Sequence, residues 1–234
     1  MSQLPLGPDP RTDVLRRTQA ALIARFGRIV RPPEKRRSPE WTLVQGLIGA
    51  RSKTIVSNTS TDTLLAEYGS WEAVADAPVE ALAERLRRQT FPEMSARRLK
   101  DCLLAIRGEC GTVSLALLEG METQAAMEWL ERLPGIARKI AAQVVNTSTL
   151  DRPAMVIEGH HRRIMQRMGI VPERADTTRT YNTLAPILPP EWSAGDMDEH
   201  HLLLKRLGQT CCRVRAAQCG NCPVRQYCET ALSG

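Results

Sequence analysis

One lysine near the middle of the chain has the type and surroundings that covalent chemistry requires. Lys139 ends the stretch 133–139 (Leu-Pro-Gly-Ile-Ala-Arg-Lys), which lies between two segments of helical hydrophobic spacing. The Pro-Gly pair should turn the chain, so that backbone N–H groups and the start of a helix point at one spot suited to an anion. The helix dipole and the adjacent Arg138 favour the neutral amine, which is the nucleophilic form. A plain helix–turn–helix without chemistry is the alternative interpretation.

A carboxylate further along the chain is the expected partner of this lysine. Glu158 follows an extended apolar run, 154–157, and precedes another helical pattern. A helix of about eight residues carries the chain roughly 12 Å away from Lys139, and the polar loop 146–153 is long enough to span the return. We therefore expect Glu158 beside Lys139, with its carboxylate kept ionised by the start of the next helix.

Cysteines close to the C-terminus have the spacing of a metal centre. The pattern is C-x6-C-x2-C-x5-C, formed by Cys212, Cys219, Cys222 and Cys228. A zinc ribbon usually has two C-x2-C pairs, and only one is present, so a [4Fe-4S] cluster fits better. Arginines lie between the cysteines, namely Arg213, Arg215 and Arg225. A loop held by a cluster would present these cations to phosphate.

A turn at Phe91 is a further candidate for contact with nucleic acid. Thr90-Phe91-Pro92 separates two basic segments, 85–88 and 97–100. An exposed aromatic side chain on such a turn could enter a base stack as a wedge. Core packing of Phe91 is the competing interpretation, because the chain has only two phenylalanines.

The elements that must position these residues are helices. Apolar residues recur at helical spacing from residue 11 to residue 207, alternating with short turns, and no strand pattern is present, so the fold should be all-α. Ser38-Pro39-Glu40 has the residue types of a helix start. Residues 1–10 are polar and Pro-rich, which indicates a disordered tail.

Composition narrows the function classes. The chain has 234 residues, a net charge of +6 and a pI near 9.1, which favours a nucleic acid as partner. It has neither an 18-residue apolar run nor a charged and apolar leader, so we expect no membrane partner and a cytoplasmic protein, associated with the nucleoid if bacterial. Seven cysteines in such a chain indicate metal binding or catalysis and not disulfides.

Together these motifs resemble the helix-hairpin-helix DNA glycosylase superfamily, in particular its endonuclease III-like branch with an iron-sulfur loop. The resemblance covers about residues 38–230. The family hairpin reads L-P-G-V-G-x-K and is matched by Leu133–Lys139, while its V-D-T-H segment is matched by Ile157–His160. The cysteine spacing is also that of the family, and the combination of hairpin and cysteines is specific.

This resemblance implies two all-α domains. A six-helix barrel would span 38–160, with the helix-hairpin-helix motif at about 121–148, and a cluster domain would combine 11–37 with 161–234. The protein would act as a monomer on double-stranded DNA containing a damaged or mismatched base, preferentially a pyrimidine, which must be flipped out to expose C1′. Lys139 would attack C1′ and form a Schiff base that permits strand cleavage, and Glu158 would stabilise the sugar cation and transfer protons.

The resemblance also indicates which residues contact DNA. They are Leu133, Gly135, Ala137, Arg138, Arg51, Phe91, His160, Arg213, Arg215 and Arg225. Arg51 stands in a segment where the family commonly has a glutamine that fills the space left by the flipped base, which suggests an altered pairing preference.

Further departures from the family pattern keep alternatives open. Glu158 replaces aspartate and is one methylene longer, a displacement of about 1 Å that can cost on the order of a hundredfold in rate. Ala137 replaces a glycine, with a cost of roughly 1 kcal/mol if its Cβ strains the turn, and Gly159 replaces a threonine beside the carboxylate. The alternatives are a monofunctional glycosylase for uracil, thymine mispairs or alkylated bases, and a protein that recognises damage without cutting.

Overall fold

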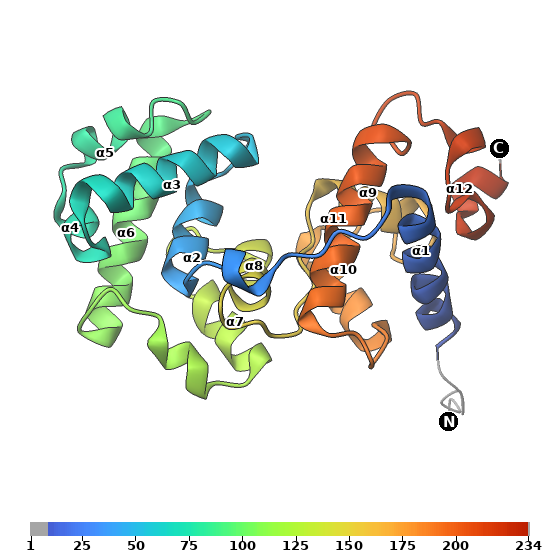
Figure 1. Cartoon of the computed structure of the whole chain (residues 1–234), viewed down its shortest axis with the longest axis horizontal. Coiled ribbons are helices and arrows are strands. Elements are labelled where there is room, and N and C mark those ends of the chain that lie inside the picture. The colour runs from blue at the N-terminus through green and yellow to red at the C-terminus, as the bar shows by residue number, and fades with distance from the viewer. Residues whose placement is uncertain (1–8, 234) are drawn as a thin grey trace. The chain divides into compact units, whose positions relative to one another are not determined.

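The computed structural model describes residues 9–233, whose regular secondary structure is almost entirely helical (Figure 1). The α-helices are α1 (Pro10–Phe26), α2 (Pro39–Ile48), α3 (Thr54–Tyr68), α4 (Trp71–Asp76), α5 (Val79–Arg85), α6 (Pro92–Cys110), α7 (Thr123–Glu131), α8 (Arg138–Thr147), α9 (Gly159–Arg167), α10 (Thr177–Leu184), α11 (Ala194–Thr210) and α12 (Glu229–Leu232). Short 3₁₀ turns are η1 (Pro33–Lys35), η2 (Ala116–Gly120), η3 (Ala185–Ile187), η4 (Cys219–Asn221) and η5 (Arg225–Tyr227). Within 9–233 the β-structure is limited to one isolated bridge, Arg37 to Ser148, so the all-α prediction is confirmed.

The chain separates into two compact units. One consists of residues 33–154 and contains α2 to α8. The other combines the described residues before Pro33 with those after Ala154, so it contains α1 and α9 to α12. Residues from both ends of the chain therefore build one unit.

Helix α2 is the centre of the unit 33–154. Ser38 caps its N-terminus by accepting a hydrogen bond from the Trp41 N–H, and Pro39 occupies the first turn, where its missing N–H costs nothing. Every residue from Thr42 to Ile48 is buried, and α2 packs against α3, α6 and α8. A helix that is buried around its circumference fixes the positions of the helices that surround it.

A chain of side-chain hydrogen bonds centred on the buried Gln45 links three of these helices. The Gln143 side chain on α8 donates to Gln45 Oε1 on α2 at 2.8 Å. Gln45 Nε2 in turn lies within hydrogen-bond distance of two acceptors on α3, Ser57 Oγ at 2.9 Å and Asn58 Oδ1 at 3.0 Å. Because these groups satisfy one another, α8 and the start of α3 are held in register through α2.

The second unit begins with α1, which packs against α11 (Figure 1). Asp9 caps α1 through its side chain and Pro10 is the first helical residue, so the expected disordered tail is wrong for these two positions. Residues 1–8 of that expected tail lie outside the described residues. Glu199 on α11 is 1% exposed and accepts hydrogen bonds from Arg28 and from the Ile29 N–H, which fixes the chain after α1.

Two buried histidines connect α9 with α11 in this unit. The ring centroids of His161 and His200 are 5.6 Å apart, and Trp192 lies 4.8 Å from His200. Burial lowers the pKa of His161 to about 3 and holds the pKa of His200 well below its usual range. Both imidazoles are therefore neutral packing groups at neutral pH.

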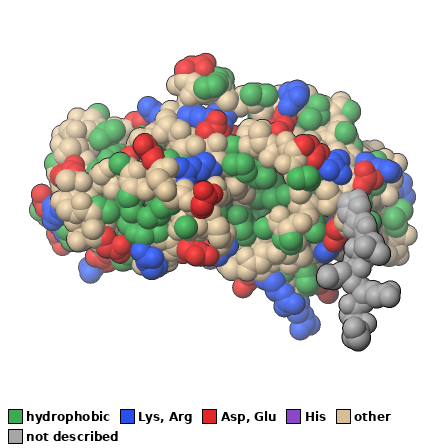
Figure 2. Space-filling view, turned by 90° about the horizontal axis from the view of Figure 1, so that it is seen from below, with side chains coloured by type: hydrophobic (Ala, Val, Ile, Leu, Met, Phe, Trp, Pro, Cys, Tyr) green, Lys and Arg blue, Asp and Glu red, His purple; other side chains and the backbone are tan. Residues whose placement is uncertain are grey.

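Charged side chains of both signs are interspersed on the surface. On the face shown in Figure 2, Lys and Arg alternate with Asp and Glu and with apolar patches. The positive charge of the chain is thus not gathered into one field on this face. None of the helices within 9–233 has the length and apolarity needed to cross a membrane.

Candidate functional site

The hairpin around Lys139 is formed by α7, a tight turn and α8. The turn closes with hydrogen bonds from Leu133 N to Leu130 O (3.1 Å) and from Ile136 N to Leu133 O (3.1 Å). Gly135 has φ +80°, and a Cβ there would meet Leu47 Cδ1 at 3.0 Å, so both the backbone and the space require glycine. The side chain of Leu133 is buried, so this predicted DNA contact anchors the turn from the inside and offers only its backbone to a ligand.

Lys139 is the second residue of α8, as the spacing predicts. Ala137 precedes the helix with φ −111° and ψ 167° and gives it no side-chain cap. This extended conformation suits any residue, so the strain expected from replacing glycine with Ala137 is absent. The uncapped first turn of α8 keeps backbone N–H groups and the positive end of the helix dipole available next to Lys139.

Arg138 is held inside the protein. Its guanidinium forms a two-point ion pair with Glu131 at the end of α7, including Nη2 to Oε2 at 3.0 Å, and its side chain is 11% exposed. A bidentate pair of this kind closes the hairpin. This pair engages the guanidinium of Arg138 within the protein, and Glu131 offsets the charge that the sequence places beside Lys139. The contact of Arg138 with DNA stays a prediction.

Glu158 begins α9 in the second unit. It is the N-cap residue, and its Oε1 accepts a hydrogen bond from the His160 N–H at 3.0 Å. Residues 154–157 before it are buried, so the carboxylate stands on a rigid base at the positive end of a helix. Because Glu158 itself makes the cap, Gly159 does not weaken it as the comparison with threonine suggests.

His160 faces the interior of the second unit. Its Nδ1 lies 3.0 Å from the guanidinium of Arg163, and a Cβ placed on Gly208 would lie only 2.4 Å from the same nitrogen. The imidazole thus packs closely against α11 and takes a structural position, so the geometry favours this role over the predicted DNA contact.

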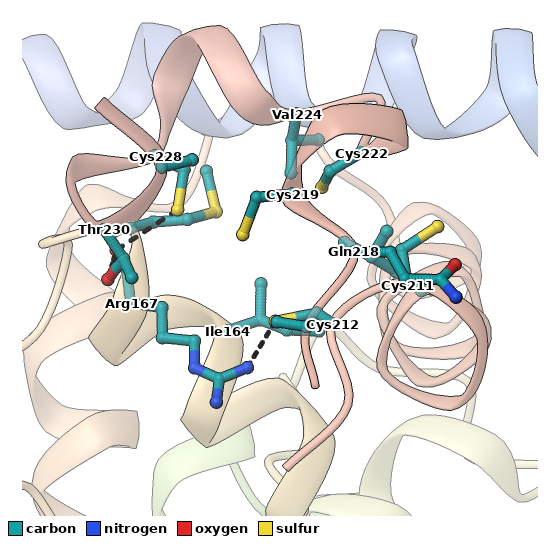
Figure 3. A pocket seen from close by; sticks show the side chains of 14 residues that line it. Ile164, Arg167, Cys211, Cys212, Gln218, Cys219, Cys222, Val224, Cys228 and Thr230 are labelled. Carbon is teal, nitrogen blue, oxygen red and sulfur yellow. Dashed lines mark hydrogen bonds between the residues drawn. The ribbon is translucent and has the colours of Figure 1, made fainter. Parts of the chain in front are cut away.

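The four spaced cysteines line a single cavity of about 110 Å³ in the second unit. Figure 3 shows the sulfur atoms of Cys212, Cys219, Cys222 and Cys228 turned toward the same space, whereas the sulfur of Cys211 turns aside. None of the seven cysteines is in a disulfide. Burial raises the pKa of the Cys222 thiol to about 11, and the neighbouring cysteines add to this effect, so this thiol ionises readily only beside a cation.

The donor set and the lining of the cavity fit an iron–sulfur group. The four thiols share a space that is lined mostly by apolar groups such as Ile164 and Val224, with Arg167, Gln218 and Thr230 as the polar side chains. Cysteine thiolates are the usual ligands of such a group.

Two arginines of α9 fix the loop that carries the first cysteine, a feature that sequence analysis missed. Arg163 donates to the Cys212 carbonyl at 2.7 Å, and Arg167 donates to Cys212 Sγ at 3.2 Å and to the Arg213 carbonyl at 2.7 Å. The one sign of this role in the sequence is that Arg163 and Arg167 are four residues apart, which places them on one face of a helix. Arg213, Arg215 and Arg225 are exposed on the segment that these contacts hold.

Arg51 and Phe91, 40 residues apart by number, meet on the surface of the unit 33–154. Phe91 is 37% exposed, so core packing does not account for it, and the Arg51 guanidinium lies 5.9 Å above its ring. Thr90 joins the two turns by donating to the Arg51 carbonyl at 3.1 Å and by a backbone hydrogen bond to Ser52 Oγ at 3.0 Å. Next to them, both amide atoms of Gln89 are buried without a hydrogen-bond partner within 9–233, which the sequence does not reveal.

Comparisons with known proteins agree with this geometry. The chain is 26% identical to endonuclease III of Escherichia coli over 193 residues, covering 82% of this chain and 84% of the relative. It is 25% identical to endonuclease III of Rickettsia conorii over 189 residues, covering 80% and 82%. No family model matches the sequence.

Solved structures share the fold. A non-covalent endonuclease III–DNA complex superimposes with a TM-score of 0.75 at 21% identity, covering 95% of this chain and 97% of the other. A thermostable thymine-DNA glycosylase gives a TM-score of 0.74 at 15% identity, covering 97% and 100%.

Proposed function

We propose that the chain is a member of the helix-hairpin-helix DNA glycosylase superfamily and acts as a DNA repair glycosylase with an associated AP lyase activity. The substrate we propose is double-stranded DNA that contains a damaged or mismatched pyrimidine. The observation that carries the proposal is Lys139 in the first turn of α8, at the end of the hairpin, where an uncapped helix start accompanies an amine. We further propose that the protein acts as a monomer in the cytoplasm.

In the proposed reaction the target nucleotide leaves the base stack, because C1′ is out of reach in a paired duplex. The neutral amine of Lys139 attacks C1′ as the bond to the base breaks, and the base leaves with the electron pair of that bond and takes up a proton. Loss of protons from the lysine nitrogen and opening of the sugar ring give a Schiff base. Removal of a C2′ proton then expels the 3′ phosphate by β-elimination.

Glu158 is the proposed catalytic carboxylate. Its position at the start of α9 places a carboxylate at the positive end of the helix dipole, where it can stabilise a cationic sugar and accept a proton from the attacking amine. The extra methylene relative to aspartate displaces the carboxylate by about 1 Å, so the chemical step should be slower than with aspartate.

A [4Fe-4S] cluster is the proposed cofactor, and Cys212, Cys219, Cys222 and Cys228 would hold it. The cluster supplies a covalent tie between segments of the chain and a positive centre that favours thiolates. The chain's own arginines do the rest, because Arg163 and Arg167 hold the loop on which Arg213 and Arg215 stand exposed to solvent. Those exposed cations suit contact with DNA phosphates.

Borohydride trapping tests the proposal. Incubation of the protein with lesion-containing duplexes and borohydride should give a covalent protein–DNA adduct, and Lys139→Ala should abolish it. Lys35→Ala removes an exposed lysine of the same unit and should leave the adduct unchanged. Absence of an adduct with every lesion and with abasic sites, or its persistence in Lys139→Ala, would refute the lyase activity.

The same assay identifies the alternatives. A monofunctional glycosylase acting on uracil, thymine mispairs or alkylated bases would release free base from an uncut strand. A protein that recognises damage without cutting is favoured by one observation, Glu158 in the place of aspartate. Tight binding to lesions with no base release, even after Glu158→Asp, would identify that second class.

A further inference from the structure

Arg98 on α6 lies against the hairpin turn, although it is 35 residues or more from the turn in sequence. A Cβ placed on Gly135 would be 3.7 Å from both Cβ and Cδ of Arg98, so the aliphatic stem of this arginine packs on the glycine backbone. The guanidinium begins one bond beyond Cδ, and the residue is exposed to solvent. Within 9–233 this guanidinium forms no ion pair and no hydrogen bond. A cation without a partner is therefore held beside the turn.

The turn itself presents donors. Gly135 and Ala137 are exposed, and in the described part of the chain their N–H groups donate no hydrogen bond. The Ile136 N–H between them is used, because it donates to the Leu133 carbonyl at 3.1 Å. Backbone N–H groups and a guanidinium next to them share one kind of ligand, an anion with several acceptor oxygens.

The arginine inside the hairpin contributes no net charge to this place. Arg138 is paired with Glu131, and the two charges cancel. A phosphate bound at the turn therefore needs a positive charge from another element. Arg98 is the arginine that packs on Gly135, and no carboxylate pairs with it within 9–233.

Helix α6 also joins this cation to the exposed aromatic turn. Phe91 is the N-cap residue of α6, and Arg98 follows seven residues later, which is about two turns and nearly the same helix face. The rise of the helix separates the two positions by about 10 Å, the length of about three base-pair steps. A phosphate held by Arg98 would thus lie within a few nucleotides of a base step that Phe91 enters.

We infer that Arg98 binds a backbone phosphate of DNA at the hairpin turn, and that the positive charge of this contact comes from α6 and not from Arg138. The inference rests on the proposed function, which supplies the DNA. The parallel N–H donors of a guanidinium match two oxygens of a phosphodiester. Because a phosphate contact carries no sequence information, Arg98 fixes where the duplex lies against Phe91 and Lys139 and does not select a base.

The salt dependence of binding tests the inference without requiring catalysis. The probe is a duplex with one tetrahydrofuran abasic analogue, and its dissociation constant is measured by fluorescence anisotropy over a series of salt concentrations. Arg98→Gln should reduce the slope of log affinity against log salt by about 1, as expected for the loss of one phosphate contact. Arg98→Lys keeps the charge but not the two-point geometry, so it should keep the slope while binding is weaker.

Matched variants separate this contact from general charge and from hairpin stability. Arg97→Gln removes the neighbouring exposed arginine, which points about 100° away around α6, and should leave the slope nearly unchanged. The double variant Glu131→Gln with Arg138→Gln removes an ion pair without changing the net charge. It should lower the melting temperature and keep the slope.

A scan with methylphosphonates locates the phosphate. Each substitution replaces one charged phosphate of the same duplex with an uncharged group. At one position within a few nucleotides of the abasic analogue, the substitution should weaken binding of the wild-type protein severalfold and should have no effect on Arg98→Gln.

An unchanged slope in Arg98→Gln would overturn the inference. So would a slope that falls by about 1 in the Glu131 and Arg138 double variant, or a scan in which every sensitive position stays sensitive in Arg98→Gln. Base release from lesion duplexes, measured in parallel, reports on the proposed function separately. Release by a protein whose slope does not depend on Arg98 would refute the phosphate contact alone, and the contact without any release would refute the glycosylase alone.

Discussion

The two units place their functional residues in opposite ways. In the unit 33–154, Arg51 and Phe91 lie on turns and Lys139 lies in the first turn of α8, while the apolar faces of α2, α6 and α8 make the core beneath them. In the second unit, the cysteines surround an internal cavity and Cys228 is itself buried. The thiols that would bind the cofactor therefore line the inside of this unit.

In the unit 33–154, substitutions at the functional residues should therefore change activity with little effect on stability. In the second unit they should change both. A surface turn can change its side chains at a cost within about 0.5 kcal/mol when the core is untouched. A residue that lines a cavity cannot be exchanged at so small a cost. Its loss alters the packing and removes a ligand of the metal group that holds the loop together. Substitutions in the two units should therefore give distinguishable patterns of loss.

The largest effect should come from Lys139→Ala. Base excision with strand cleavage should fall by at least about a thousandfold, because no other group replaces the attacking amine. The melting temperature followed by circular dichroism should stay within about 2 °C of the wild type. A large drop in melting temperature would break the comparison, since it would make the hairpin a stability element as well.

Cys219→Ser should give the reverse pattern. Iron content should fall sharply and the second unit should lose several kcal/mol of stability, because binding of a structural metal group contributes directly to folding. Amide hydrogen exchange should report the loss in α9 to α12 and spare α2 to α8. Cys110→Ser, outside the cysteine set, serves as the control and should leave iron content unchanged.

Glu158→Asp should raise activity with little effect on stability. Base release under single-turnover conditions should increase by up to about a hundredfold, since the shorter side chain returns the carboxylate by about 1 Å. Aspartate caps a helix as well as glutamate does at this position, so the melting temperature should hardly change. Unchanged or slower release would show that the site is built around the longer carboxylate.

The smallest effect should be a dependence of stability on pH that is confined to the second unit. The folded protein keeps His161 neutral down to a pKa of about 3, whereas the unfolded chain binds a proton near pH 6.5. Between these values the unfolded state holds more protons, so this stabilisation is complete above about pH 6.5 and decreases as the pH falls toward 3. Thermal melts from pH 7.5 to pH 5 should show it, with a shallower slope in His161→Phe. An equal slope in that variant would assign the dependence to other groups.

Local signals in the sequence were sufficient for part of this picture. The Ser38-Pro39 start of α2 and the position of Lys139 at the start of α8 follow from capping and turn chemistry, which act over a few residues. The spacing of the cysteines likewise indicated one centre, and they line one cavity.

Other features depend on contacts between distant segments. The meeting of Arg51 with Phe91 requires the hydrogen bonds through Thr90, and the role of Arg167 depends on how α9 packs against the loop after α11. The ion pair of Arg138 with Glu131 and the extended backbone of Ala137 are set by how the hairpin closes, so the residue pattern alone revealed neither of them.

The composition of the second unit from both ends of the chain also sets an order of assembly. During synthesis, residues 33–154 emerge together and can fold as a unit while the rest of the chain is still being made. Helix α1 emerges before this unit, but its partner α11 and the cysteine segment follow more than a hundred residues later. The amphipathic α1 must therefore wait in an unpartnered state, and a product that terminates before Cys228 would combine a folded hairpin unit with an unfinished cysteine cavity.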